Sequence, residues 1–77
     1  MDIRDCITCT FYRMTDMIPP ENYRVIDVDL SAVDGNKYFY RTEIVIGITR
    51  YIVRFCAHRN QIGEIIATTP RGVEIAK

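Results

Sequence analysis

The sequence predicts an all-β fold, a small antiparallel barrel or curved sheet of about five short strands. Side chains branched at Cβ (12 Ile, 7 Thr and 6 Val) make up 25 of the 77 residues, and such residues favour strands over helices. Leucine, a common residue of helix cores, occurs only at Leu30. Apolar and acidic side chains alternate over Tyr23–Leu30, which is the pattern of a strand with one buried face.

The first half of the chain predicts two strands separated by a loop. Cys6–Tyr12 is the first predicted strand. Thr15–Asn22 is a predicted loop, because the adjacent prolines Pro19 and Pro20 remove two backbone donors and disfavour helix before them. The second strand is Tyr23–Leu30, with its even-numbered apolar residues on one face and its aspartates on the other.

A hairpin is predicted at Asp34-Gly35-Asn36, followed by a strand over Lys37–Ile46. A three-residue loop, with Asn36 in the left-handed conformation, keeps the apolar residues of the two strands on the same face. A one-residue slip would turn every side chain over. The predicted cross-strand neighbours are Leu30 with Tyr40, Ile26 with Ile44, and Asp29 with Arg41.

The segment Lys37–His58 is too long for one strand, since 22 residues would extend about 70 Å. It is expected to break at Gly47-Ile48-Thr49. The core side chains of the next strand would be Tyr51, Val53, Phe55 and Ala57, and the outward ones Arg50, Ile52, Arg54, Cys56 and His58. A turn over Arg59–Ile62, a strand over Gly63–Thr69 and either a turn or a strand at Val73–Ala76 complete the chain.

The alternative is a mixed α+β fold with one helix near residues 42–58. Polar residues there recur at spacings of three and four (Glu43, Gly47, Arg50, Arg54 and His58), which would form one stripe on a helix. The eight β-branched residues in this segment and its interior glycine oppose a helix.

Length and composition indicate a single domain over residues 1–77. The 48% hydrophobic and 26% charged content is that of a folded domain rather than a disordered one. No apolar run approaches the roughly 20 residues that span a bilayer, and the acidic start Met1–Asp5 is unlike a secretory signal. The expected location is therefore the cytoplasm.

The cysteines and the one histidine define a possible zinc set, Cys6, Cys9, Cys56 and His58. A C-x-x-C pair with a distant C-x-H pair matches the ligand types of tetrahedral zinc. However, Cys6 and Cys9 would point to opposite faces of a regular strand, and free cysteine is commonly a small buried hydrophobe. The expectation is that no metal or other cofactor binds, with zinc as the alternative.

Catalysis finds little support. The four glycines are isolated, so no phosphate-binding loop is present, and a single histidine has no nucleophile motif beside it. Nucleic-acid binding by an arginine- and aromatic-bearing sheet face is an alternative, although the net charge of zero is unusual for such proteins.

The sequence therefore predicts a small non-enzymatic binding module that regulates or inhibits another protein through direct contacts. Tyrosine and arginine are frequent anchors of protein interfaces, and eight of the ten basic residues are arginine. The predicted contact residues, which would face an acidic partner, are Phe39, Arg41, Arg50, Arg54, His58 and Arg59. Homodimerisation through the edge strands Cys6–Tyr12 or Val73–Ala76 is a further expectation, because both carry few charges.

Overall fold

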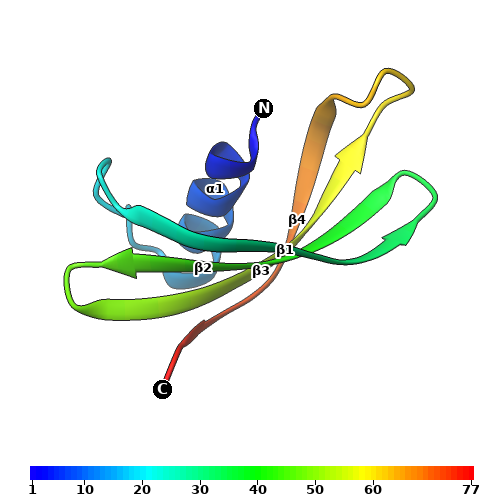
Figure 1. Cartoon of the computed structure of the whole chain (residues 1–77). Helices are drawn as coiled ribbons and strands as arrows, with labels where there is room; N and C mark the ends of the chain where they lie inside the picture. The colour runs from blue at the N-terminus through cyan, green and yellow to red at the C-terminus, as the bar shows by residue number, and fades with distance from the viewer.

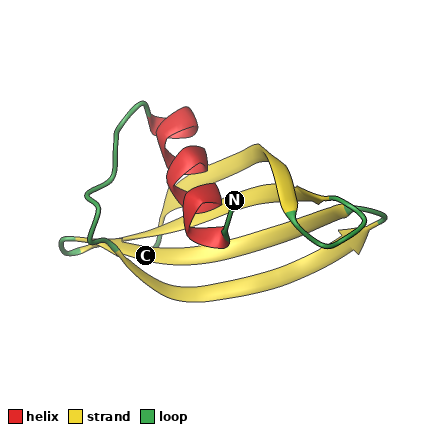
Figure 2. Ribbon diagram, turned by 90° about the horizontal axis from the view of Figure 1, so that it is seen from above, coloured by secondary structure: helices red, strands yellow, loops and turns green.

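The computed structural model describes all residues from Met1 to Lys77 and contains one helix and four strands. Helix α1 (Ile3–Thr15) precedes β1 (Arg24–Asp34), β2 (Lys37–Ile46), β3 (Thr49–Arg59) and β4 (Ile65–Ile75). The strands form one antiparallel sheet in the order β1-β2-β3-β4, so each pairs with its neighbour in the chain (Figure 1). The helix lies on one side of this twisted sheet, and no element covers the other side (Figure 2).

The expected all-β barrel or curved sheet of about five strands is met in part: the antiparallel sheet is present, but it has four strands and does not close, and the chain also contains a helix. The α+β alternative names the right class but the wrong segment, because residues 42–58 form β2, a turn and β3. Gly47 adopts a φ of 63° in that turn, a left-handed conformation that glycine tolerates. The chain therefore reverses where a helix would have continued.

Cys6–Tyr12 was predicted as a strand but lies within α1. Asp2 and Asp5 form a capping box, in which each side chain accepts a hydrogen bond from the other's backbone N–H. The residues that face the sheet recur at helical spacing: Ile3, Cys6, Ile7, Thr10 and Phe11. Burial of this stripe against the sheet outweighs the modest helix propensity of its β-branched residues.

The β1–β2 hairpin has two of the three expected cross-strand pairs and a different turn. Asp34 pairs with Lys37, which leaves a two-residue turn in which Gly35, with φ 61°, is the left-handed residue rather than Asn36. A bulge at Ser31 then shifts the register by one residue, so that Leu30 still faces Tyr40 and Asp29 still faces Arg41. A second bulge pairs Ile44 with Val25 and not with Ile26.

The strand expected at Gly63–Thr69 and the turn or strand expected at Val73–Ala76 are replaced by one continuous strand, β4. It passes through Pro70 without a break because it lies at the edge of the sheet, where a residue lacking a backbone N–H is tolerated. The pairing with β3 skips Arg71, which is therefore a bulge residue. The sheet edges are thus β1 and β4, and only the second of the two expected edge segments lies at an edge.

The hydrophobic core lies between α1 and the sheet. Helix α1 packs chiefly against β4 and β3. Its residues Cys6, Ile7 and Phe11 form the core together with buried residues of β2, β3 and β4. Those strand residues are Ile44, Val53, Phe55, Ala57 and Ile65. The alternation predicted for β3 is confirmed, since Val53, Phe55 and Ala57 are buried on the helix side.

The single helix, 13 residues long, is too short and too polar to cross a membrane.

Candidate functional site

The face of the sheet away from the helix, here called the outer face, carries five of the six predicted contact residues. Alternation along β2 places Phe39 and Arg41 there, and alternation along β3 does the same for Arg50, Arg54 and His58. Arg41 lies directly opposite Arg54 in the register. The structure therefore gathers these side chains on one surface that no other part of the chain covers.

Arg59, the sixth predicted contact residue, lies on the opposite, helix side of the sheet. It was expected in a turn, but β3 extends through it, so alternation turns it away from His58. Its guanidinium donates to the Tyr40 hydroxyl at 2.9 Å and to the Gly63 carbonyl at 2.6 Å, and it lies 4.9 Å from the centre of the Tyr38 ring. Arg59 thus ties the β3–β4 turn to β2 and does not belong to the outer face.

Three arginines of the outer face are paired with acids on the same face. Glu43 accepts from Arg50 at 2.6 Å and from Arg41 at 3.4 Å, and Arg54 lies 3.0 Å from Glu74. The hydrogen bond from Arg50, together with the charges of both arginines, lowers the pKa of Glu43 although partial desolvation opposes this shift. These contacts order the arginines and neutralise much of their charge.

A shallow hollow of about 200 Å³ lies at one end of the outer face. It contains two predicted contact residues, Phe39 and His58, and one that sequence reasoning missed, Arg71. The complete lining is Lys37, Phe39, Cys56, His58, Thr69 and Arg71. The Arg71 guanidinium lies 4.8 Å from the centre of the Phe39 ring, and His58 Nε2 is 3.1 Å from the Thr69 hydroxyl.

The possible zinc ligands are not brought together. Cys6 and Cys9 belong to α1 on one side of the sheet, whereas Cys56 and His58 belong to the outer face on the other. No group of three or more His, Cys, Asp or Glu side chains has a geometry that could hold a metal ion. Cys6 is fully buried in the core, and this burial, with the nearby Asp5 and Asp2 charges, raises its pKa from 9.0 to about 11. It is therefore a neutral packing residue at neutral pH.

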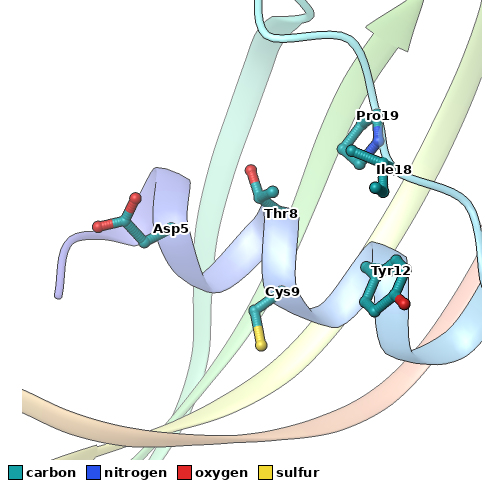
Figure 3. Close-up of a pocket in the computed structure, with 6 residues that line it drawn as sticks. All are labelled: Asp5, Thr8, Cys9, Tyr12, Ile18 and Pro19. Carbon is teal, nitrogen blue, oxygen red and sulfur yellow. The ribbon is translucent and has the colours of Figure 1, made fainter.

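A second hollow, of about 310 Å³, lies between α1 and the loop that follows it (Figure 3). Ile18 and Pro19 of the loop lie beside Thr8 and Tyr12 of the helix, with Asp5 and Cys9 completing the lining. The loop is anchored to the helix by Arg4, which donates to the carbonyls of Glu21 and Tyr23. The thiol in this hollow is that of Cys9. It has no histidine beside it, because His58 lies on the other side of the sheet.

In comparisons with known proteins, no family model, no curated protein and no solved structure matches this chain. The geometry of its own residues is therefore the basis for a functional proposal.

Proposed function

We propose that this chain is a non-enzymatic binding module that regulates or inhibits another protein, and that the outer face is its contact surface. One observation carries the proposal: an entire face of a four-stranded sheet has no cover, while the only helix packs on the other face. The bare face presents arginines held in place by ion pairs. Arginines ordered in this way lose less side-chain entropy when a partner binds.

The charges of the outer face favour a protein as the partner. Acidic residues share this surface with the arginines: Asp27 and Asp29 of β1 lie opposite Glu43 and Arg41, and Glu74 of β4 lies beside Ile52. A phosphate backbone crossing the face would meet these carboxylates. A protein surface that is mainly acidic, with some basic groups at matching positions, would complement both signs of charge.

Nucleic-acid binding is a second candidate, favoured by Phe39 with Lys37 and Arg71 beside it. An aromatic ring next to basic side chains is the usual arrangement for stacking a base and holding its phosphate. The salt dependence of the binding affinity distinguishes the two candidate functions. Binding through several phosphates would weaken steeply, with a slope of about −0.7 in log affinity against log salt for each single-strand phosphate contacted.

The absence of catalysis is part of the proposal. The hollow at the end of the outer face is lined by no carboxylate, so His58 has no acid beside it to orient the ring as a general base. His58 instead shares a hydrogen bond with the Thr69 hydroxyl. A binding role requires only the surface described above.

Site-specific photocrosslinking tests the contact surface. A photoreactive phenylalanine analogue would replace Ile52, which lies on the outer face between Glu43 and Glu74. The same analogue at Gln61, an exposed residue of the β3–β4 turn, is the control. In cells that express the protein, position 52 is expected to give a discrete protein adduct and position 61 none. Adducts formed only with nucleic acid, or equally from both positions, would overturn the proposal.

Charge variants then test whether arginines make the contact. Arg50→Glu with Arg54→Glu is expected to abolish the adduct, but it places new acids beside Glu43 and Glu74 and so lowers stability as well. The exchange Arg54→Glu with Glu74→Arg retains the ion pair and the net charge while moving the positive group to β4. It should reduce adduct formation about tenfold with an unchanged melting temperature. An undiminished adduct would remove Arg54 from the contact.

A further inference from the structure

Two basic residues of the outer face that have no acidic partner both line the hollow defined above. Among the basic residues that β2, β3 and β4 place on this face, Arg41, Arg50 and Arg54 have acidic partners. Lys37 and Arg71 have none, since none of the three ion pairs of the structure includes them. Lys37 also makes no ion pair with Asp34, its neighbour across the β1–β2 turn. An anion therefore finds two available donors together at the hollow, whereas at Arg41, Arg50 or Arg54 it must displace a carboxylate. Arg24 of β1, which also has no ion pair, lies opposite Val45 at the other end of the face.

The bulge in β4 builds this hollow. Arg71 is the unpaired residue between Pro70 and Gly72, and its side chain extends over the outer face. It reaches the Phe39 ring two strands away, with the guanidinium 4.8 Å from the ring centre. The side chain of Cys56, on the intervening strand, is consequently only 4% exposed although it points to the outer face.

The lining provides an apolar floor and a polar rim. Phe39 and Cys56 form the floor, and the basic groups of Lys37 and Arg71 flank it. The Thr69 hydroxyl adds a neutral hydrogen-bonding group that His58 orients from 3.1 Å. A planar guanidinium bonds a carboxylate or phosphate at two points, and an apolar floor strengthens such bonds by excluding water.

We propose that the hollow is the anchor site for one anionic side chain, a carboxylate or a phosphorylated residue, in an acidic segment of the protein partner. This inference rests on the proposed function, because it assigns the partner's main contact within the same face. The size of the site fits such a group: about 200 Å³ is below the roughly 300–1,000 Å³ typical of pockets for whole small molecules. Arg71 and Lys37 bind the anion, and Phe39 holds Arg71 in position.

Peptide titration of the full-length, isotope-labelled protein tests the anchor site by NMR. Three peptides of the form Gly-Ser-X-Ser-Gly serve as probes, with X as glutamate, phosphoserine or glutamine. The first two are expected to shift the backbone amide signals of Lys37, His58 and Thr69 saturably, and the glutamine peptide is expected not to. Equal binding of the glutamine peptide, or shifts centred on Arg41 and Arg54, would overturn the inference.

Matched variants identify the residues involved. Arg71→Gln is expected to weaken binding of the phosphoserine peptide at least tenfold, as is expected for loss of a charge-assisted, two-point hydrogen bond. Arg54→Gln, which removes the same charge from the same face, should change it less than twofold because Arg54 already has Glu74. Equal losses in the two variants would show a diffuse charge effect and refute the anchor site. An oligothymidylate that binds more tightly than either anionic peptide would overturn the assignment to a protein segment.

Thiol labelling gives an independent readout in a Cys9→Ser background. Cys6 is fully buried, so Cys56 is the thiol to follow. Arg71→Ala should speed labelling of Cys56 about tenfold or more, and bound phosphoserine peptide should slow it in the parent protein. No protection by the peptide would contradict binding at the hollow. The experiments distinguish failure of the two proposals. If no peptide binds but the adduct at position 52 forms, only the anchor site is refuted; if the peptides bind but no adduct forms, only the contact surface is refuted.

Discussion

Two buried threonines have opposite hydrogen-bonding states. Thr10 of α1 and Thr42 of β2 are both fully buried. The Thr42 hydroxyl donates to the Val53 carbonyl at 2.9 Å, whereas the Thr10 hydroxyl has no partner. A buried polar group without a hydrogen bond costs free energy, and one with a good partner contributes a modest net stabilisation. Similar side chains therefore have opposite effects on stability.

Valine replacement should separate them, because valine has nearly the shape of threonine without the hydroxyl. Thr10→Val is expected to raise the free energy of unfolding by about 1 kcal/mol, and Thr42→Val to lower it by about 1 kcal/mol. Urea denaturation followed by circular dichroism measures both. The explanation fails if the two changes have the same sign.

The carboxylate of Glu43 predicts a pH dependence of stability. Because the pKa of Glu43 is lower in the folded state than its usual value of 4.5, its ion pairs stabilise the fold above that value. This contribution disappears as the pH falls through the folded-state pKa. The difference in melting temperature between the parent protein and Glu43→Gln should therefore shrink as the pH is lowered from 6 to 3. A constant difference would contradict the pairing.

At the scale of elements, helix α1 is defined by residues at its two ends. The Asp2 side chain accepts from the Asp5 N–H at 2.8 Å, and Asp16 at the C-terminal end adopts a left-handed φ of 60° while its N–H bonds to the Tyr12 carbonyl at 2.8 Å. Aspartate and asparagine tolerate this conformation better than most residues. Thirteen residues form a marginal helix alone, so the caps and the contact with the sheet act together.

The N-terminal cap can be tested with a matched pair. Asp2→Ala should lower the free energy of unfolding by about 1 kcal/mol, since it leaves the Asp5 N–H without its acceptor. Asp2→Asn retains a cap of nearly equal quality and should lower it by less than half as much. Thermal denaturation of both variants provides the comparison, and equal losses would mean that the negative charge, not the cap, is what matters.

The two sheet edges are protected by different features. β1 contains two bulges and the charged residues Asp27 and Asp29, and β4 contains Pro70 and a bulge at Arg71. Bulges, charges and proline each interfere with regular pairing to another chain. Homodimerisation through Val73–Ala76 stays a prediction. A second copy would pair with the part of β4 that follows the bulge at Arg71, where the strand is regular.

For the whole molecule, the position of the helix decides which part of the sheet is core. α1 packs against β4 and β3, so Val28, Leu30 and Val33 on the helix side of β1 are left largely exposed. Ile44 is fully buried, whereas Leu30, on the same side of the sheet, is 46% exposed. Apolar character alone does not distinguish these two residues.

Alanine replacement of this aliphatic pair tests the placement. Ile44→Ala should lower the free energy of unfolding by about 2–5 kcal/mol, as expected for a cavity in a packed core. Leu30→Ala should lower it by less than about 1 kcal/mol, because much of its surface is already in water. Urea denaturation of the two variants is the measurement, and similar losses would mean that the core extends over β1.

Local features of the sheet could be predicted from the sequence. The Lys37–Ile46 strand, the turn at Gly47 and the alternation over Tyr51–His58 depend only on neighbouring residues. The placement of five contact residues on one face followed from that alternation. Helix α1 was missed because its β-branched residues resemble a strand, although the Asp2–Asp5 spacing was a usable signal of a helix start.

Arg71 could not be identified as part of the site from the sequence. Its position depends on an extra residue in the pairing between β4 and β3, and its neighbour Phe39 lies two strands away. No local pattern reports such a contact. The same holds for the ion pairs of Arg50 with Glu43 and of Arg54 with Glu74, because each of them joins two strands.

The sequence by itself determined that residues 37–46 and 51–58 are extended, that the chain turns at Gly47 and which side chains of these strands share a face, because these properties arise from steric preferences within a few residues. Only the tertiary structure decided that Cys6–Tyr12 is helical, that the sheet stays open and that Lys37 and Arg71, which have no acidic partner, line one hollow. These outcomes depend on burying one apolar stripe of α1 against β3 and β4 and on the bulges of β1 and β4 that shift the pairing. The stabilisation from this burial and pairing arises only when distant parts of the chain are in contact, so no local sequence pattern reports it.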